Sequence, residues 1–260
     1  MEKLTLKKYF ALRLKDKAFA ITLAIYMLLC LLSAIHWCIN FVLRDLLMSL
    51  AFIAVAPLII IAEHFIKFRS GLLFTIGVFI ISFGSILGSS FNLYTVVPFF
   101  DTILHGLSGV LFGCLGFTLA ERFFGKASDK KKFFGSLVFA LSFSLAIAVL
   151  WEIFEFTCTI LLGFDMMEDT VVTNVNSYLL AGSHAKSVEL DNIAKTVIYY
   201  GNDHTYTING YLDIGLIDTL ADMIICTIGS IVFMITSIIG FFKCPKINQL
   251  LIPQVICDTH

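Results

Sequence analysis

Apolar residues fill six long windows of the chain, and short polar stretches separate them. The windows lie near residues 18–38, 46–65, 71–90, 102–124, 134–162 and 212–242. Each window is long enough to cross about 30 Å of hydrocarbon as an α-helix. The membrane core has no water to satisfy backbone groups, and the alternating pattern of a β-barrel is absent. We therefore predict an all-α integral membrane protein with six transmembrane helices in a single polytopic membrane domain, residues 1–260.

The composition excludes a soluble fold. Hydrophobic residues make up 58% of the chain, charged residues 14%, and the mean hydropathy is +0.92, whereas soluble domains are about 45–50% apolar. The net charge of −1 gives no indication of a nucleic-acid partner. The first apolar window follows a basic segment, as in a signal peptide, but it lacks an A-x-A cleavage site, so we interpret it as a retained helix.

Lys and Arg residues predict the orientation. All but Arg44, Lys186 and Lys195 of the 18 fall on one side of a six-helix topology. The N-terminal segment alone contributes Lys3, Lys7, Lys8, Arg13, Lys15 and Lys17. Since basic loops stay in the cytoplasm, we predict that both termini are cytoplasmic in a multi-pass protein of the cell membrane.

One larger extracytoplasmic loop is predicted at about residues 165–211. Two β-rich segments, TVIYY and HTYTI, flank Gly201-Asn202-Asp203 in this loop, which is typical of a β-hairpin. We expect the loop to act as a cap or lid rather than as a linker. The seven cysteines are scattered without a C-x-x-C pair, so we interpret them as small apolar residues and not as disulfides or metal ligands.

The last three windows carry pairs of ionisable residues. The pairs are Asp101 with His105, Glu152 with Glu155, and Asp218 with Asp222. Spacings of three or four residues place both members of a pair on one helix face. At about 1.5 Å per residue, all three pairs fall near the extracytoplasmic end of their helices, at one level. We therefore predict one outward-facing intramembrane cluster.

Charge balance favours a metal ion in this cluster. Five carboxylates and one imidazole cannot all stay ionised side by side without compensation, because like charges and loss of hydration raise carboxylate pKa values. No Lys or Arg lies at this level, so we favour a bound cation over shared protons. Mainly oxygen ligands with one His fit Mg²⁺, Mn²⁺, Fe or Zn²⁺. Asp213 is either an outer ligand or a charge at the helix N-terminus.

These segments resemble the YjdF-like family of uncharacterised bacterial inner-membrane proteins. The shared pattern is Asp101 and His105 in one helix, Glu152 and Glu155 in the next, and D-T-x-x-D-M from Asp218 to Met223 in the last. The resemblance covers roughly residues 95–240. It implies a bacterial plasma-membrane location and a single functional unit, but no reaction.

Three classes of function follow from the cluster. The first is a metal-dependent hydrolase or transferase acting on a lipid-linked substrate, with six ligands and with His105 or Glu152 as acid or base. The alternative is a proton- or cation-coupled transporter or channel that uses the same cluster. A third is a non-catalytic membrane protein whose loop binds another protein. The purely structural alternative is that the cluster is a buried polar network that only stabilises the packing of the helices.

Overall fold

The computed structural model describes residues 5–256, and six of its helices are long and apolar enough to cross a membrane. The spans are α2 (Lys17–Ile39), α3 with α4 (Leu43–Ile53 and Val55–Ile66), α5 (Leu72–Ser90), α7 (Phe100–Phe124), α8 (Lys130–Leu162) and α9 (Leu216–Phe242). The prediction of six helical spans is confirmed, and their bounds agree with the predicted windows to within four residues. Lys3 and Cys257, which entered the predictions above, lie outside the described residues.

The remaining elements are short. Three further helices are α1 (Leu6–Arg13), α6 (Leu93–Val96) and α10 (Pro245–Leu251). The strands are β1 (Phe68–Arg69), β2 (Thr170–Val172), β3 (Val175–Ser177), β4 (Val188–Leu190), β5 (Thr196–Tyr200), β6 (His204–Ile208), β7 (Tyr211–Asp213) and β8 (Gln254–Val255). They form four antiparallel two-stranded ribbons, β1–β8, β2–β7, β3–β4 and β5–β6.

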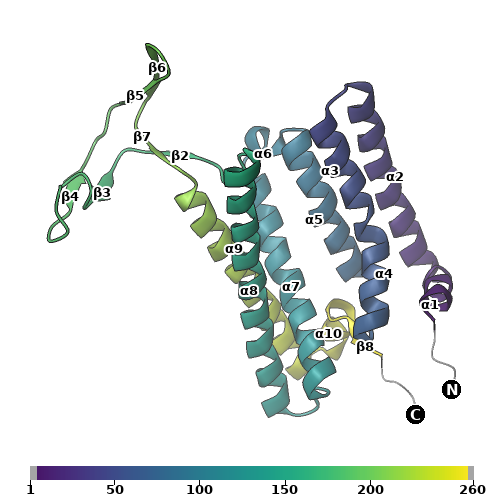
Figure 1. Cartoon of the computed structure of the whole chain (residues 1–260). Coiled ribbons are helices and arrows are strands. Elements are labelled where there is room, and N and C mark those ends of the chain that lie inside the picture. Colours follow the sequence, from purple (N-terminus) through teal and green to yellow (C-terminus); the bar gives the residue numbers. More distant parts are fainter. Residues whose placement is uncertain (1–4, 257–260) are drawn as a thin grey trace. The chain divides into compact units, whose positions relative to one another are not determined.

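The chain forms two compact units. The first contains the described residues up to Ala148 and from Ile224 onward, and the second runs from Val149 to Met223. Within the first unit α5 packs against α2 and α7, and α1, α10 and β8 gather at one end (Figure 1). The second unit contains the last turns of α8, the loop with β2 to β7, and the first turns of α9.

The helices of the first unit expose many large apolar side chains and bury several small polar ones, as expected of a membrane protein. Ile21 and Phe65 are 60% and 69% exposed, whereas Thr75 is fully buried. Small residues let the helices approach closely, since the side chains of Leu111 and Leu104 pack where Gly77 and Gly84 lack a Cβ. Lipid, rather than protein, therefore covers much of the apolar surface.

The second span is interrupted near its middle. Its helices α3 and α4 meet at Ala54, and Pro57 follows in the first turn of α4. Proline has no N–H to donate to the carbonyl four residues earlier, so the helix cannot continue unbroken here. The amide of Leu58 restores the pattern by donating to the Ala54 carbonyl at 3.1 Å.

A buried ion pair fixes α1 beneath α4. The Arg13 guanidinium lies 2.9 Å from the Glu63 carboxylate, with side-chain exposures of 3% and 0%. Glu63 also accepts hydrogen bonds from the Tyr9 hydroxyl at 3.1 Å and from the backbone N–H and the hydroxyl of Ser70. Burial and the Glu63 carboxylate raise the pKa of the Tyr9 phenol above its ordinary value. The sequence did not predict this network, although Glu63 stands as an acid within the second apolar window.

The C-terminal segment closes the same end of the first unit. Strand β8 pairs with β1, and the Pro253 carbonyl accepts a hydrogen bond from the Thr118 hydroxyl at 3.1 Å. Ile252 belongs to a buried apolar cluster with Phe117, Phe133 and Phe233. This end of the helices is therefore filled by large apolar side chains.

In the second unit the predicted hairpin is confirmed. Strands β5 and β6 pair from Thr196 with Ile208 to Tyr200 with His204, and Gly201 and Asp203 take the left-handed conformation in the turn. The last helix begins at Leu216, four residues after the start of the predicted window, because Leu212 and Asp213 pair with β2. None of the cysteines among the described residues forms a disulfide.

Candidate functional site

The first half of the predicted cluster lies at the start of α7. Asp101 stands in the first turn, where the helix dipole favours a negative charge. His105 follows one turn later, and its Nε2 lies 3.5 Å from Asp101 Oδ1. Their side chains are 28% and 13% exposed. Asp101 and His105 thus form a carboxylate/His pair whose possible ligand atoms lie close enough together to contact one metal ion.

Close helix packing fixes the position of this group. At Gly109 the helix α7 touches the Cys226 carbonyl of α9, and at Gly229 the helix α9 touches the Gly106 carbonyl of α7, so neither position has room for a Cβ. The Ser108 hydroxyl donates to the His105 carbonyl at 2.8 Å. The glycine side of α7 therefore holds the backbone beside His105 against α9.

Small polar side chains continue below His105 in the first unit. The Ser144 hydroxyl of α8 donates to the Gly109 carbonyl at 3.3 Å and lies 3.9 Å from Cys226 Sγ. Ser230, one turn further along α9, is fully buried, and its hydroxyl has no hydrogen-bond partner among the described residues. Beyond Ser230 the interior is filled by a buried apolar cluster that includes Phe117, Phe133 and Phe233. Apolar side chains therefore separate Asp101 and His105 from Glu121 and Arg122 at the other end of α7.

In the second unit, the two carboxylates of α8 lie on the buried face of that helix. Glu152 and Glu155 are only 6% and 8% exposed, whereas Phe154 and Phe156 are 49% and 54% exposed. The buried positions continue to Cys158, as the helical repeat of three to four residues requires. Trp151 donates from Nε1 to Glu155 Oε1 at 2.8 Å, a contact that the sequence did not predict. Both acids therefore lie on the side of the helix that is turned away from lipid.

The first turns of α9 carry Asp218 and Asp222, and Asp213 precedes the helix at the end of β7. Asp222 is 5% exposed. Asp218 accepts a hydrogen bond at 2.9 Å from the backbone N–H of Glu168 in the loop. Asp213 accepts from the Ile217 N–H at 2.8 Å, which is the role of a charge at a helix N-terminus rather than that of a ligand.

The structure thus groups the six predicted residues by unit. Asp101 and His105 meet in the first, and the two pairs Glu152/Glu155 and Asp218/Asp222 belong to the second. Their union into one cluster stays a prediction. The contact between the Glu168 amide and Asp218 joins residues 50 positions apart and leaves no pattern in the sequence. Trp151 and Glu155, in contrast, have the four-residue spacing of neighbours on one helix face, which is a signal that could have identified their contact.

Six apolar spans and a carboxylate/His group define a multi-pass helical membrane protein with ionisable groups buried at one end of its helices. The chain belongs to a family described as predicted membrane protein (DUF2238), which matches residues 18–241. This range extends the resemblance noted from the sequence to the first three spans, although the match does not carry the YjdF-like name. No curated protein and no solved structure matches the chain.

Proposed function

We propose that Asp101, His105, Glu152, Glu155, Asp218 and Asp222 form one metal-binding site that faces the extracytoplasmic side of the membrane. The observation that carries this proposal is the burial of carboxylates on helices whose neighbouring apolar residues are exposed. Burying a carboxylate within a membrane costs several kcal/mol unless a cation or a proton compensates it. A divalent cation compensates several carboxylates at once.

The continuity of α9 supports the inclusion of Asp222 in the proposed metal site. Gly229 and Cys226 pack against Gly106 and Gly109 of α7, so α9 is fixed to the first turns of α7 below the cluster. Asp222 precedes Cys226 by four residues on the same face of an uninterrupted helix, as His105 precedes Gly109. Asp222 is therefore the third residue that we assign to the Asp101–His105 group.

The reaction that suits such a site is metal-assisted hydrolysis or group transfer. A bound Mg²⁺, Mn²⁺, Fe or Zn²⁺ ion would lower the pKa of a coordinated water and polarise the substrate. His105 or Glu152 would accept or donate the proton. A site at membrane depth near one surface selects a substrate that is itself in the membrane, so we propose a lipid-linked substrate.

A transporter or channel would need ionisable or polar groups that continue across the membrane. Beyond Ser230 the apolar cluster with Phe117, Phe133 and Phe233 interrupts the series of polar groups. The buried hydroxyls of Thr118 and Ser237 on the far side are hydrogen-bonded to the C-terminal segment. This closed end favours a site over a pathway. Cation flux into proteoliposomes that depends on Asp222 would reverse the preference.

Metal analysis of the purified chain tests the proposal. We expect a stoichiometric divalent metal in the wild type and loss of most of it in Glu152→Gln, because the amide offers one neutral oxygen in place of a charged ligand. Glu189→Gln, which neutralises an exposed acid in β4, is the matched control and should keep the metal. A wild-type chain without stoichiometric metal, together with an unchanged Glu152→Gln variant, would contradict the proposal.

A further inference from the structure

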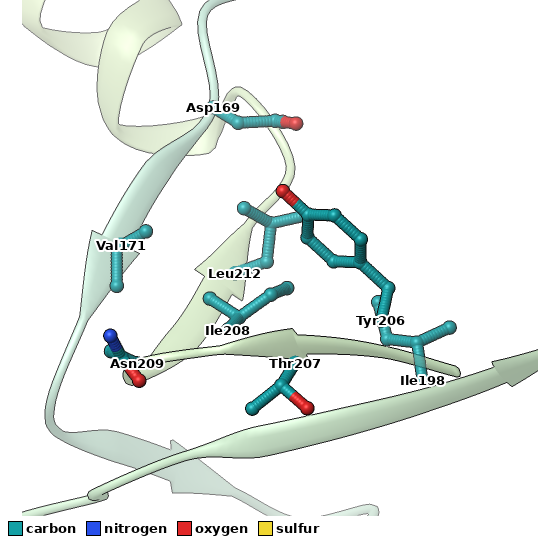
Figure 2. Close-up of a pocket in the computed structure, with 8 residues that line it drawn as sticks. All are labelled: Asp169, Val171, Ile198, Tyr206, Thr207, Ile208, Asn209 and Leu212. Atoms are coloured by element: carbon teal, nitrogen blue, oxygen red, sulfur yellow. The ribbon is translucent and has the colours of Figure 1, made fainter.

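The loop in the second unit contains an open groove of about 420 Å³. It lies between the β2–β7 ribbon, which contributes Val171 and Leu212, and the β5–β6 hairpin, which contributes Ile198, Tyr206 and Ile208 (Figure 2). This volume falls within the range of about 300–1,000 Å³ that is typical of small-molecule sites. The groove is thus large enough for a small organic ligand.

The walls of the groove leave apolar surface uncovered. Val171 is 51% exposed, Ile198 40% and Tyr206 63%. Two-stranded ribbons bury little apolar surface by themselves and are only marginally stable without a further layer. Apolar side chains that line a concave surface in this way indicate a ligand with an apolar body.

One end of the groove is acidic. The Asp169 carboxylate and the Tyr206 hydroxyl lie on the same side of its mouth (Figure 2). Partial burial and the neighbouring carboxylates of Asp165 and Asp213 raise the pKa of Asp169 above its usual value. Three carboxylates close together attract a cation, and the face of a Tyr ring adds a cation–π contact.

We propose that this groove binds a small organic cation that carries an apolar substituent, such as an alkylammonium group. The charge pairs with Asp169 and lies beside the Tyr206 ring, while the substituent covers Val171, Ile198 and Leu212. Charge complementarity distinguishes this ligand from a neutral lipid or an uncharged peptide strand. The binding of the cation does not depend on the metal site proposed above.

The residue that precedes Asp169 in the chain connects the groove with the proposed metal site. Glu168 precedes Asp169, and its backbone N–H donates to the Asp218 carboxylate at 2.9 Å. A ligand that fixes Asp169 therefore also fixes the amide that holds Asp218. If the proposed function is correct, the groove recognises the charged part of the substrate close to the reacting end.

Calorimetric titration of the full chain in dodecyl maltoside tests the charge contribution. The probe is hexyltrimethylammonium chloride in the presence of EDTA, and we expect saturable one-to-one binding. Asp169→Asn should weaken it about tenfold, because it removes an opposite charge at contact distance. Asp203→Asn neutralises an acid in the hairpin turn, outside the groove, and should bind within about twofold of the wild type, the expected effect of a charge distant from the ligand.

Variants of Tyr206, with a control at Tyr199, test how much the aromatic ring contributes to probe binding. Tyr206→Leu should weaken binding by about threefold or more, since it removes the ring face, whereas Tyr206→Phe should retain it. Tyr199→Leu changes an 81% exposed tyrosine of the same hairpin that does not line the groove, and it should have no effect. Asp169→Glu keeps the charge and should retain binding, which separates loss of charge from misfolding.

Three results of these titrations would overturn the proposal. The first is that the wild type shows no saturable binding of the probe at millimolar concentration. The second is that uncharged hexanol binds as tightly as the probe. The third is that Asp169→Asn and Asp203→Asn bind the probe with equal affinity. The Glu152→Gln variant should bind the probe as the wild type does, although it is expected to lose the metal. Loss of probe binding in that variant would locate the cation at the carboxylate cluster and also overturn the proposal.

Discussion

Replacing Glu63 by glutamine is expected to destabilise the protein by about 3–5 kcal/mol, which is the usual cost of removing one partner from a buried ion pair. Glu63 accepts hydrogen bonds from Arg13, Tyr9 and Ser70, and its side chain is fully buried. An amide would turn an N–H₂ group toward donors and leave Arg13 with only the partly exposed Asp16 as a counter-ion. The measurement is the free energy of unfolding by SDS titration in mixed micelles.

Asp16→Asn is the control for this change. Asp16 also pairs with Arg13, at 3.0 Å, but its side chain is 34% exposed. Exposed pairs contribute about 0–1 kcal/mol, so the control should unfold nearly as the wild type does. The double variant Arg13→Met with Glu63→Met removes both charges and should recover part of the loss. Equal unfolding of Glu63→Gln and Asp16→Asn would show that the buried pair does not stabilise the fold.

Replacing Gly109 by alanine is the second change with a large expected effect. A Cβ at this position overlaps the carbonyl oxygen of Cys226, a backbone atom that cannot rotate away. Overpacking costs about 1–3 kcal/mol even among side chains, and we expect about 3 kcal/mol or more here, since the helices α7 and α9 must separate. The melting temperature in detergent and the fraction of monodisperse protein are the measurements.

Gly135→Ala is the control for this change and is expected to stabilise the protein. Gly135 lies in α8 with no heavy atom near the position of a Cβ, so the gain in helix propensity should stabilise the chain by up to about 1 kcal/mol. If Gly109→Ala melted as Gly135→Ala does, α7 and α9 would not be in backbone contact. Because the same contact supports Asp101 and His105, Gly109→Ala should also lower the metal content if the proposed function is correct.

The candidate site was predictable in part. Spacing along single helices identified Asp101 with His105, and the 3.5 Å contact confirms that pair. Spacing also placed Glu152 and Glu155 on one face, which the structure shows to be buried. The partners of the acids were not predictable, because the Glu168 amide reaches Asp218 across 50 residues of chain. Helical periodicity carries no information on such distant contacts.

The sequence by itself determined the number and the approximate bounds of the spans, because hydrocarbon thickness and backbone hydrogen bonding act on each helix separately. It also determined the β5–β6 hairpin, whose turn residues favour left-handed backbone conformations. Only the tertiary structure decided that Arg13 pairs with Glu63, that Gly109 receives the Cys226 carbonyl, and that two ribbons enclose a groove. Each of these features joins residues distant in the chain, and their pairing depends on shape and charge after the helices and ribbons have packed.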